Sequence, residues 1–92
     1  MTEKRLGFVG IVLENRSHAP AVNAIISQYA SLIRARVGVP DTEEDAAVIG
    51  LIVQGDDLSL GALTAKLGNL EGVQVKSALT KKNISKEPRK DE

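Results

Sequence analysis

The chain has 92 residues, with 12 basic and 12 acidic side chains, one histidine and no cysteine. This length fits one domain with a modest core, and the balanced charge provides no overall field that would attract nucleic acid or an anionic membrane. The lack of cysteine excludes disulfides, thiolate-bound metals, thiolate-ligated iron–sulfur clusters and a cysteine nucleophile.

The first predicted strand is Leu6 to Leu13, LGFVGIVL, which is apolar on both of the faces that a strand presents. Lys4 and Arg5 precede it, but Glu14 ends the apolar run and no small-residue cleavage site follows, so we do not interpret it as a signal peptide. No apolar stretch approaches the length of a membrane-spanning helix. The expected location is the cytoplasm.

A helix is predicted after the polar turn of Glu14 to Ser17, because the apolar period changes there from two to about 3.6. Ser17 or His18 is the expected N-cap, and Pro20 is tolerated in the first turn. The apolar stripe consists of Val22, Ile25, Ile26, Tyr29, Leu32 and Ile33. Such a stripe has to pack on a sheet.

Two neighbouring strands are predicted next. Arg34 to Val39 alternates basic residues with small or apolar ones, which is typical of a strand with one wet face, and Pro40 ends it. Ala46 to Val53, AAVIGLIV, has no polar residue on either face and predicts a central strand. The acidic turn Asp41 to Asp45 joins the two strands, so we expect a hairpin.

A second helix is predicted to begin at Asp56 or Asp57 as its N-cap, with the apolar stripe Leu60, Leu63, Leu67 and Leu70. Gly61 and Gly68 weaken it. Either they let the helix lie close to the sheet, or Gly68 and Asn69 form a frayed end.

Gly72 starts the last predicted strand, Val73 to Leu79. Residues 81–92, KKNISKEPRKDE, contain one aliphatic side chain and predict a charged, disordered tail after a single domain of residues 1–80.

The order β-α-β-β-α-β predicts an α+β, ferredoxin-like plait, a four-stranded antiparallel sheet with both helices on one face and the first and third strands central. We expect the bare face to carry Arg34, Arg36, Gln74 and Lys76 on the outer strands and apolar side chains in the middle. An uncovered apolar strip predicts a homo-oligomer, dimer or tetramer, joined through this face; a monomer with an apolar surface is the alternative. Gly7, Gly10 and Gly50 would allow close approach of another sheet.

Several stretches resemble a known family. They are RVGVP (Arg36 to Pro40), AAVIGLIVQ after the acidic turn, and GALTAKLGNLEGVQVK (Gly61 to Lys76). The family is a group of small bacterial proteins known as regulators of the iron-only hydrogenase system, and the resemblance covers most of residues 4 to 80. It implies an ACT-like plait, related in shape to the C-terminal domain of the nickel-responsive repressor, and association through the sheets.

The chain departs from the nickel repressor in two respects. A site of that kind needs several His and Cys ligands, whereas this chain has one His and no Cys, so we expect no metal site and no cofactor. We also expect no counterpart of the repressor's separate DNA-binding segment.

Four residues are candidates for binding a small effector. Asn15 and Arg16 lie on the first strand-to-helix loop, where free amides favour an anion, although a simple polar turn is the plainer interpretation. Arg34 and Arg36 either clamp a carboxylate or phosphate, or pair with Glu14 or Asp45 across an interface. His18 lacks a catalytic neighbour, and we interpret it as an exposed cap residue.

Three classes of function remain open. The first is a homo-oligomeric regulatory or sensor module that binds an effector or a protein, and the second is a structural interaction subunit with no small ligand. The third, a small enzyme, is disfavoured because no set of acid, base and nucleophile is present. The basic tail residues are offset by acidic ones and have no aromatics beside them, so we do not expect direct nucleic-acid binding.

Overall fold

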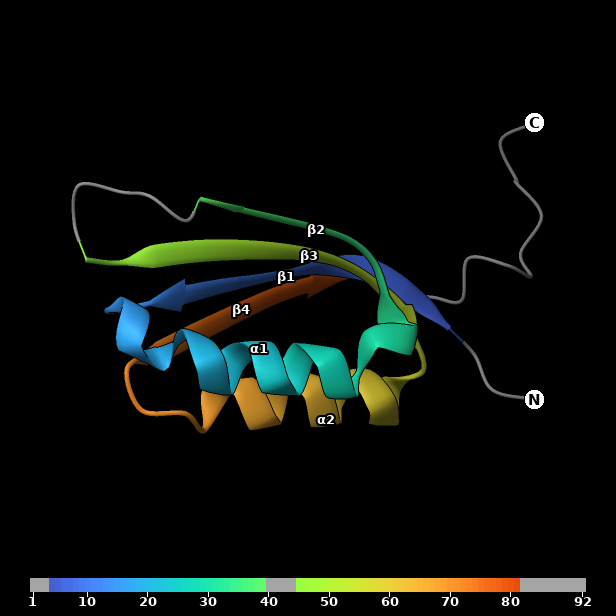
Figure 1. Ribbon diagram of the computed structural model, residues 1–92. Helices are drawn as coiled ribbons and strands as arrows, with labels where there is room; N and C mark the ends of the chain where they lie inside the picture. The colour runs from blue at the N-terminus through green and yellow to red at the C-terminus, as the bar shows by residue number, and fades with distance from the viewer. Residues whose placement is uncertain (1–3, 40–44, 82–92) are drawn as a thin grey trace, which may run out of the picture.

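The protein folds as one antiparallel sheet with two helices on one face (Figure 1). The computed structural model describes residues 4–39 and 45–81. Its elements are β1 (Arg5–Leu13), the short 3-10 turn η1 (Arg16–His18), α1 (Ala19–Gln28), a second turn η2 (Ala30–Leu32), β2 (Ile33–Val39), β3 (Ala47–Gly55), α2 (Asp57–Gly68) and β4 (Val73–Leu79). The strand order is β2-β3-β1-β4, which confirms the predicted plait with the first and third strands central.

The core lies between the sheet and the two helices. Alternate residues of β1 and β3 point toward the helices and are buried, because side chains along a strand alternate between the two faces. The helices contribute the buried side chains of Val22, Ile26, Leu60, Leu63 and Leu67. No described polar or charged side chain is buried in this core.

The first helix is shorter than predicted. It ends at Gln28, and the chain then makes the turn η2 and enters β2 at Ile33, so Leu32 and Ile33 pack against the core from outside the helix. Leu32 ends the turn and Ile33 begins the strand, and both are apolar at the spacing of the helical stripe by coincidence. The structure shows no side-chain cap at His18, the residue before α1; instead the Asn15 side chain accepts a hydrogen bond from the Ser17 amide and caps η1.

The start of α2 confirms one of the two predicted caps. Asp56 Oδ1 accepts a hydrogen bond from the Ser59 amide at 2.7 Å, and this bond, supported by the Ser59 hydroxyl, lowers the pKa of Asp56 below its ordinary value of 3.8. A Cβ on Gly61 or on Gly68 would meet no atom within 4 Å. The glycines of α2 therefore face open space, and they do not bring the helix close to the sheet.

His18 is partly buried, which corrects its interpretation as an exposed cap. Gly72 has a φ of +76°, the left-handed region that favours glycine, and a Cβ at this position would overlap the His18 imidazole. The first loop therefore packs against the turn before β4.

Residues 82–92, most of the predicted tail, lie outside the described residues, and the extent of the domain stays a prediction. In the two described ranges, no helix is long and apolar enough to cross a membrane.

Candidate functional site

The helix-free face of the sheet, which we call the outer face, is largely apolar. Seven large apolar side chains on it are between 36% and 66% exposed, and they come from β1, β2 and β3: Leu6, Phe8, Val12, Val37, Val39, Val48 and Ile52. A sheet that is wet on one side normally alternates apolar with polar residues. The outer face does not follow that pattern on its two central strands.

The Phe8 ring covers the centre of this face. Gly10 of β1 pairs with Gly50 of β3, and a Cβ on either residue would crowd the Phe8 ring, at 3.1 Å for Gly10 and 2.8 Å for Gly50. These two glycines therefore accommodate a ring of their own chain. Gly7 points to the other face and lies close to Leu79 of β4, so none of the three leaves a gap for a second backbone.

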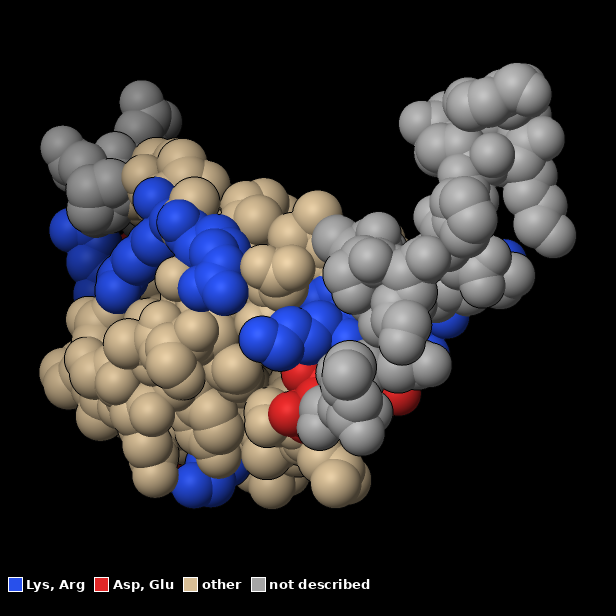
Figure 2. All heavy atoms as spheres, turned by 90° about the vertical axis from the view of Figure 1, so that its right-hand side faces the viewer, with Lys and Arg blue, Asp and Glu red and all other residues tan. Residues whose placement is uncertain are grey.

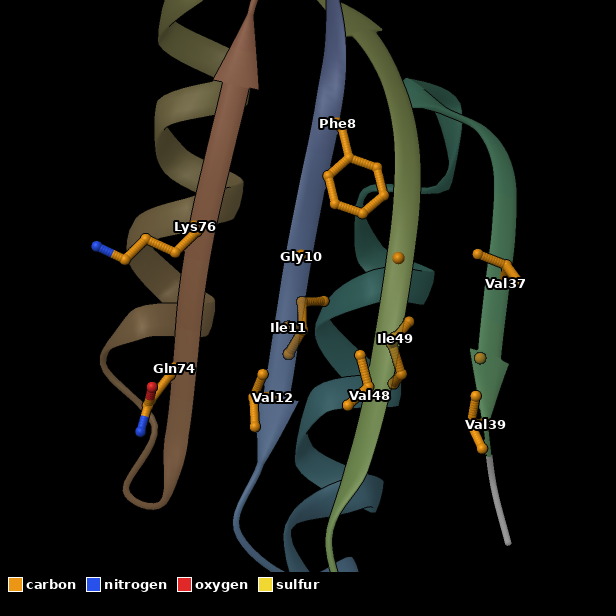
Figure 3. A pocket seen from close by; sticks show the side chains of 12 residues that line it. Phe8, Gly10, Ile11, Val12, Val37, Val39, Val48, Ile49, Gln74 and Lys76 are labelled. Carbon is orange, nitrogen blue, oxygen red and sulfur yellow. The ribbon is translucent and has the colours of Figure 1, made fainter. Parts of the chain in front are cut away.

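A shallow hollow of about 300 Å³ lies beside the ring. Figure 3 views it with the helices behind the sheet: Phe8 and Val12 line it from β1, Val48 from β3, and Val37 and Val39 from β2. Gln74 and Lys76 of β4 supply its polar side, as predicted for the bare face. The hollow is therefore apolar except along one edge.

A β-bulge changes the phase of β2. Ile33 pairs with Val53, but Ala35 pairs with Ile52, so two residues of β2 oppose one residue of β3. From there on, Arg36 points to the helix side of the sheet, where its Nη2 donates a hydrogen bond to Asn23 Oδ1 of α1 at 2.7 Å. The prediction that Arg36 lies on the bare face is therefore wrong.

The bulge also places Val37 and Val39 on the outer face, because they follow Arg36 in alternation. Val37 lies opposite Gly50, the position at which strict alternation from Arg34 would have placed Arg36. A one-residue shift of this kind moves every following side chain to the opposite face.

A second cavity, which we call the arginine groove, lies on the helix side between α1 and the edge of the sheet. Its volume is about 410 Å³. Polar side chains of Arg16, Asn23 and Arg36 line it together with apolar ones. Among the described residues, the lining consists of Leu13, Arg16, Ala19, Asn23, Arg36, Gly38, Val39, Ala47, Val48 and Ile49. The groove and the outer hollow share four lining residues near the end of β2 and the start of β3: Gly38, Val39, Val48 and Ile49.

The structure brings two of the four predicted site residues together. Arg16 and Arg36 line the arginine groove. Asn15 precedes Arg16 but uses its side-chain oxygen to cap η1. Asn23 was missed by sequence reasoning, because nothing in the helix pattern distinguishes it from the other polar residues on the exposed side of α1.

Arg34 lies at the other end of β2. Its side chain donates to Gln54 Oε1 and to the Ser31 carbonyl oxygen. Figure 2 views the molecule from this end and shows several Lys and Arg side chains with acidic side chains beside them. Arg5 Nε and Asp57 Oδ1 form an ion pair at 2.7 Å.

Two further expectations concern charges and metals. Within residues 4–39 and 45–81, neither Arg34 nor Arg36 forms an ion pair with Glu14 or Asp45, so a pair across an interface stays a prediction.

No group of three His, Cys, Asp or Glu side chains that could hold a metal ion is found in the described part of the chain. The absence of a metal site also stays a prediction.

Comparison with known families gives a match over most of the chain. The model of the TM1266-like family, described as "Iron-only hydrogenase system regulator, putative", matches residues 5–77. No curated protein sequence matches. Among solved structures, the uncharacterized protein TM1266 from Thermotoga maritima is 40% identical, with a TM-score of 0.79 over 86% of this chain and 100% of that one.

More distant structures share the fold. The ACT domain from GTP pyrophosphokinase of Chlorobium tepidum is 22% identical, with a TM-score of 0.67 over 79% of this chain and 96% of that one. The C-terminal domain of the MgtC protein from Mycobacterium tuberculosis is 17% identical, with a TM-score of 0.65 over 92% of this chain and 96% of that one. At this level of identity the likeness shows an ACT-like fold.

Proposed function

Because the chain belongs to the TM1266-like family of iron-only hydrogenase system regulators, we propose that it is a homo-oligomeric, ACT-like regulatory module that acts by binding an effector or a protein. The subunits join through the outer face. The observation that carries this proposal is the group of seven exposed apolar side chains on that face.

The extent of this patch supports an interface. Monomeric proteins rarely expose a continuous apolar patch of more than a few hundred Å². A standard interface removes about 800 Å² from water on each partner. Strands β1, β2 and β3 all contribute to the patch, so a partner that covers it covers most of one face of the sheet.

A second copy of the chain suits this surface. The polar residues that line the hollow, Gln74 and Lys76, are both on β4 at one edge of the sheet. Two copies related by a two-fold axis can therefore bring their apolar centres together without placing a charge in the middle of the interface.

The experiment is a mass measurement by light scattering at about 50 µM protomer, a concentration at which a stable association is populated. The unmodified protein is expected to be a dimer or larger. Ile52→Lys, on the outer face and 40% exposed, is expected to remain folded and run as a monomer. Leu58→Lys places the same charge on α2, at a side chain that is 88% exposed, and should leave the mass unchanged.

A monomeric mass for the unmodified protein would remove the oligomer from this proposal. The alternative function, an interaction subunit with no small ligand, predicts the same oligomer. A thermal-shift screen with amino acids, nucleotides and metal ions separates the two, because a ligand that binds the folded state raises the melting temperature.

A further inference from the structure

We propose that two copies of the chain pack outer face to outer face about a two-fold axis that runs across the strands, so that the Phe8 ring of each copy enters the outer hollow of the other. This inference rests on the oligomer proposed above and names the side chains that join its subunits. It follows from the order of side chains on the outer face, from the place of the Phe8 ring and from the charge at one edge of the sheet.

Side chains on the outer face form rows, because residues of neighbouring strands lie opposite one another. One row, which we call the glycine row, runs from β2 through β3 and β1 to β4 and consists of Val37, Gly50, Gly10 and Lys76. The next row, which we call the valine row, consists of Val39, Val48, Val12 and Gln74. The two rows are about 7 Å apart, since they are separated by two residues along each strand.

The Phe8 ring and the hollow lie on opposite sides of the glycine row. Phe8 belongs to the row beyond it, and its ring reaches the two glycines, so that a Cβ on Gly50 would lie 2.8 Å from the ring. The hollow extends from the ring over the valine row (Figure 3). The outer face therefore presents a projecting ring directly beside a depression.

A two-fold axis across the strands fits these two features together. When it is placed at the glycine row, this axis exchanges the two sides of the row, so each ring faces the hollow of the other copy. An axis along the strands would keep every row opposite the same row, which would place ring against ring and leave both hollows unfilled. Unfilled space loses dispersion contacts. Both axes keep the strands of the two sheets aligned, as in packed sheets generally.

The hollow has room for the ring of a second copy. Its volume is about 300 Å³, whereas an apolar cavity of about 150 Å³ in another protein holds a benzene molecule. Val12, Val39 and Val48 offer it aliphatic side chains. Phe8 is 45% exposed in the single chain, so the exposed side of its ring would exchange water for these contacts.

The charge of the outer face agrees with the same axis. Lys76 and Gln74 are the polar members of the two rows, and both are on β4. An axis across the strands lays β4 over β4 of the partner, so the polar side chains meet at one edge, beside water. An axis along the strands would lay Lys76 over Val37 of the partner subunit and take its ammonium group out of water at a cost. At the edge, the lysine stems can carry both ammonium groups outward, and Figure 3 shows Lys76 pointing away from β1.

The first test mixes two charge types. Unmodified ¹⁵N-labelled protein and unlabelled Lys76→Glu are equilibrated together at about 50 µM protomer, and the dimers are counted by native mass spectrometry. The proposed axis places position 76 opposite position 76 of the partner, so a mixed dimer has an opposite-charge pair where both pure dimers have a like-charge pair. We expect about 70% or more of the dimers to be mixed, whereas random mixing gives half.

A matched control makes the same change of charge on the helix side of the molecule. Lys66 is exposed on α2, and Lys66→Glu is expected to give random mixing with the unmodified protein. Random mixing with Lys76→Glu, or an equal excess of mixed dimers with Lys66→Glu, would refute the proposed axis.

A second measurement follows the ring itself in the unmodified chain. The chain has a single Phe, so the phenyl signals belong to Phe8. In a mixture of unlabelled and ¹³C-labelled copies, an isotope-filtered NOE experiment records only contacts between subunits. The Phe8 ring is expected to show NOEs to methyl groups of Val12 and Val48 of the partner subunit. Tyr29, which packs on the helix side, should show none.

These measurements separate the inference from the oligomer on which it rests. A monomeric mass for the unmodified protein would overturn both. A dimeric mass together with random mixing of Lys76→Glu, or with no contact between subunits from the Phe8 ring, would overturn this inference and leave the oligomer standing.

Discussion

Replacing either of two neighbouring residues of β3 by lysine should produce opposite results, because the residues point to opposite faces of the sheet. Ile49 faces the helices and is 7% exposed, whereas Val48 faces away and is 47% exposed. We expect Ile49→Lys to unfold the protein and Val48→Lys to leave it folded.

The magnitudes follow from burial. Ile49→Lys loses about 1.5–3 kcal/mol of apolar burial, and it places an ammonium group in a core without polar partners at a cost of several kcal/mol. The sum exceeds about 5 kcal/mol, which reaches the net stability of a small domain. Val48→Lys loses about 1 kcal/mol of partial burial, because the lysine stem can lie along the outer face with its ammonium group in water.

The assay is urea unfolding followed by far-ultraviolet circular dichroism, at one low protomer concentration because association also stabilises the folded state. A folded Ile49→Lys together with an unfolded Val48→Lys would mean that the two faces are exchanged. The register of β3 would then be wrong by one residue, and with it the composition of the outer face.

Other substitutions test local features. Gly61→Ala should stabilise the protein by about 0.5–1 kcal/mol in urea unfolding, because the added Cβ meets open space in mid-helix. Gly72→Ala should destabilise it by about 1–2 kcal/mol, because Gly72 has a positive φ. A destabilised Gly61→Ala together with a stabilised Gly72→Ala would contradict both placements. Folding lowers the pKa of Asp56, so the stability that its charged side chain contributes is present above pH 3.8 and is lost as the pH falls through the folded pKa. Below about pH 4, the melting temperature of Asp56→Asn should therefore fall less than that of the unmodified protein. Removing residues 81–92 should leave the melting temperature nearly unchanged, and a fall of about 4–8 °C, equivalent to about 1 kcal/mol, would show that the tail contributes to the fold. Elemental analysis of chelator-washed protein should find no stoichiometric zinc, nickel or iron.

The order of the elements could be predicted because each segment with a single hydrophobic period is long enough to recognise. The two central strands have apolar residues on both faces, and β4 begins and ends at the predicted residues, Val73 and Leu79. The end of α1 could not be predicted. Leu32 and Ile33 continue the spacing of the helical stripe although they lie beyond the helix, and periodicity alone does not distinguish a helix from a turn that happens to bury the same side chains.

The candidate site was predicted only in part, for a reason that lies in the backbone. The sequence singled out Arg16 for its place on the first strand-to-helix loop and Arg36 for its place on an edge strand, but strict alternation put Arg36 on the same face as Arg34. A bulge has no reliable sequence signature in a strand of mixed residues, so the face of each residue after it is known only from the pairing with β3. The bond between Arg36 and Asn23 follows from that pairing, since both residues must be on the helix side.

Because of the bulge at Arg34 and Ala35, the number of residues between Ile33 and Arg36 affects which side chains of β2 lie on each face of the sheet. If one residue were deleted between Ile33 and Arg36 and the pairing after it were kept, the bulge would disappear without changing any side chain of the groove or the outer face. If the shortened strand instead kept a bulge after Ile33, Val37 and Val39 would turn toward the helices and Arg36 would enter the apolar face. Insertions and deletions at this point can therefore alter both surfaces together, whereas substitutions at Arg36 or at Val37 change one surface at a time.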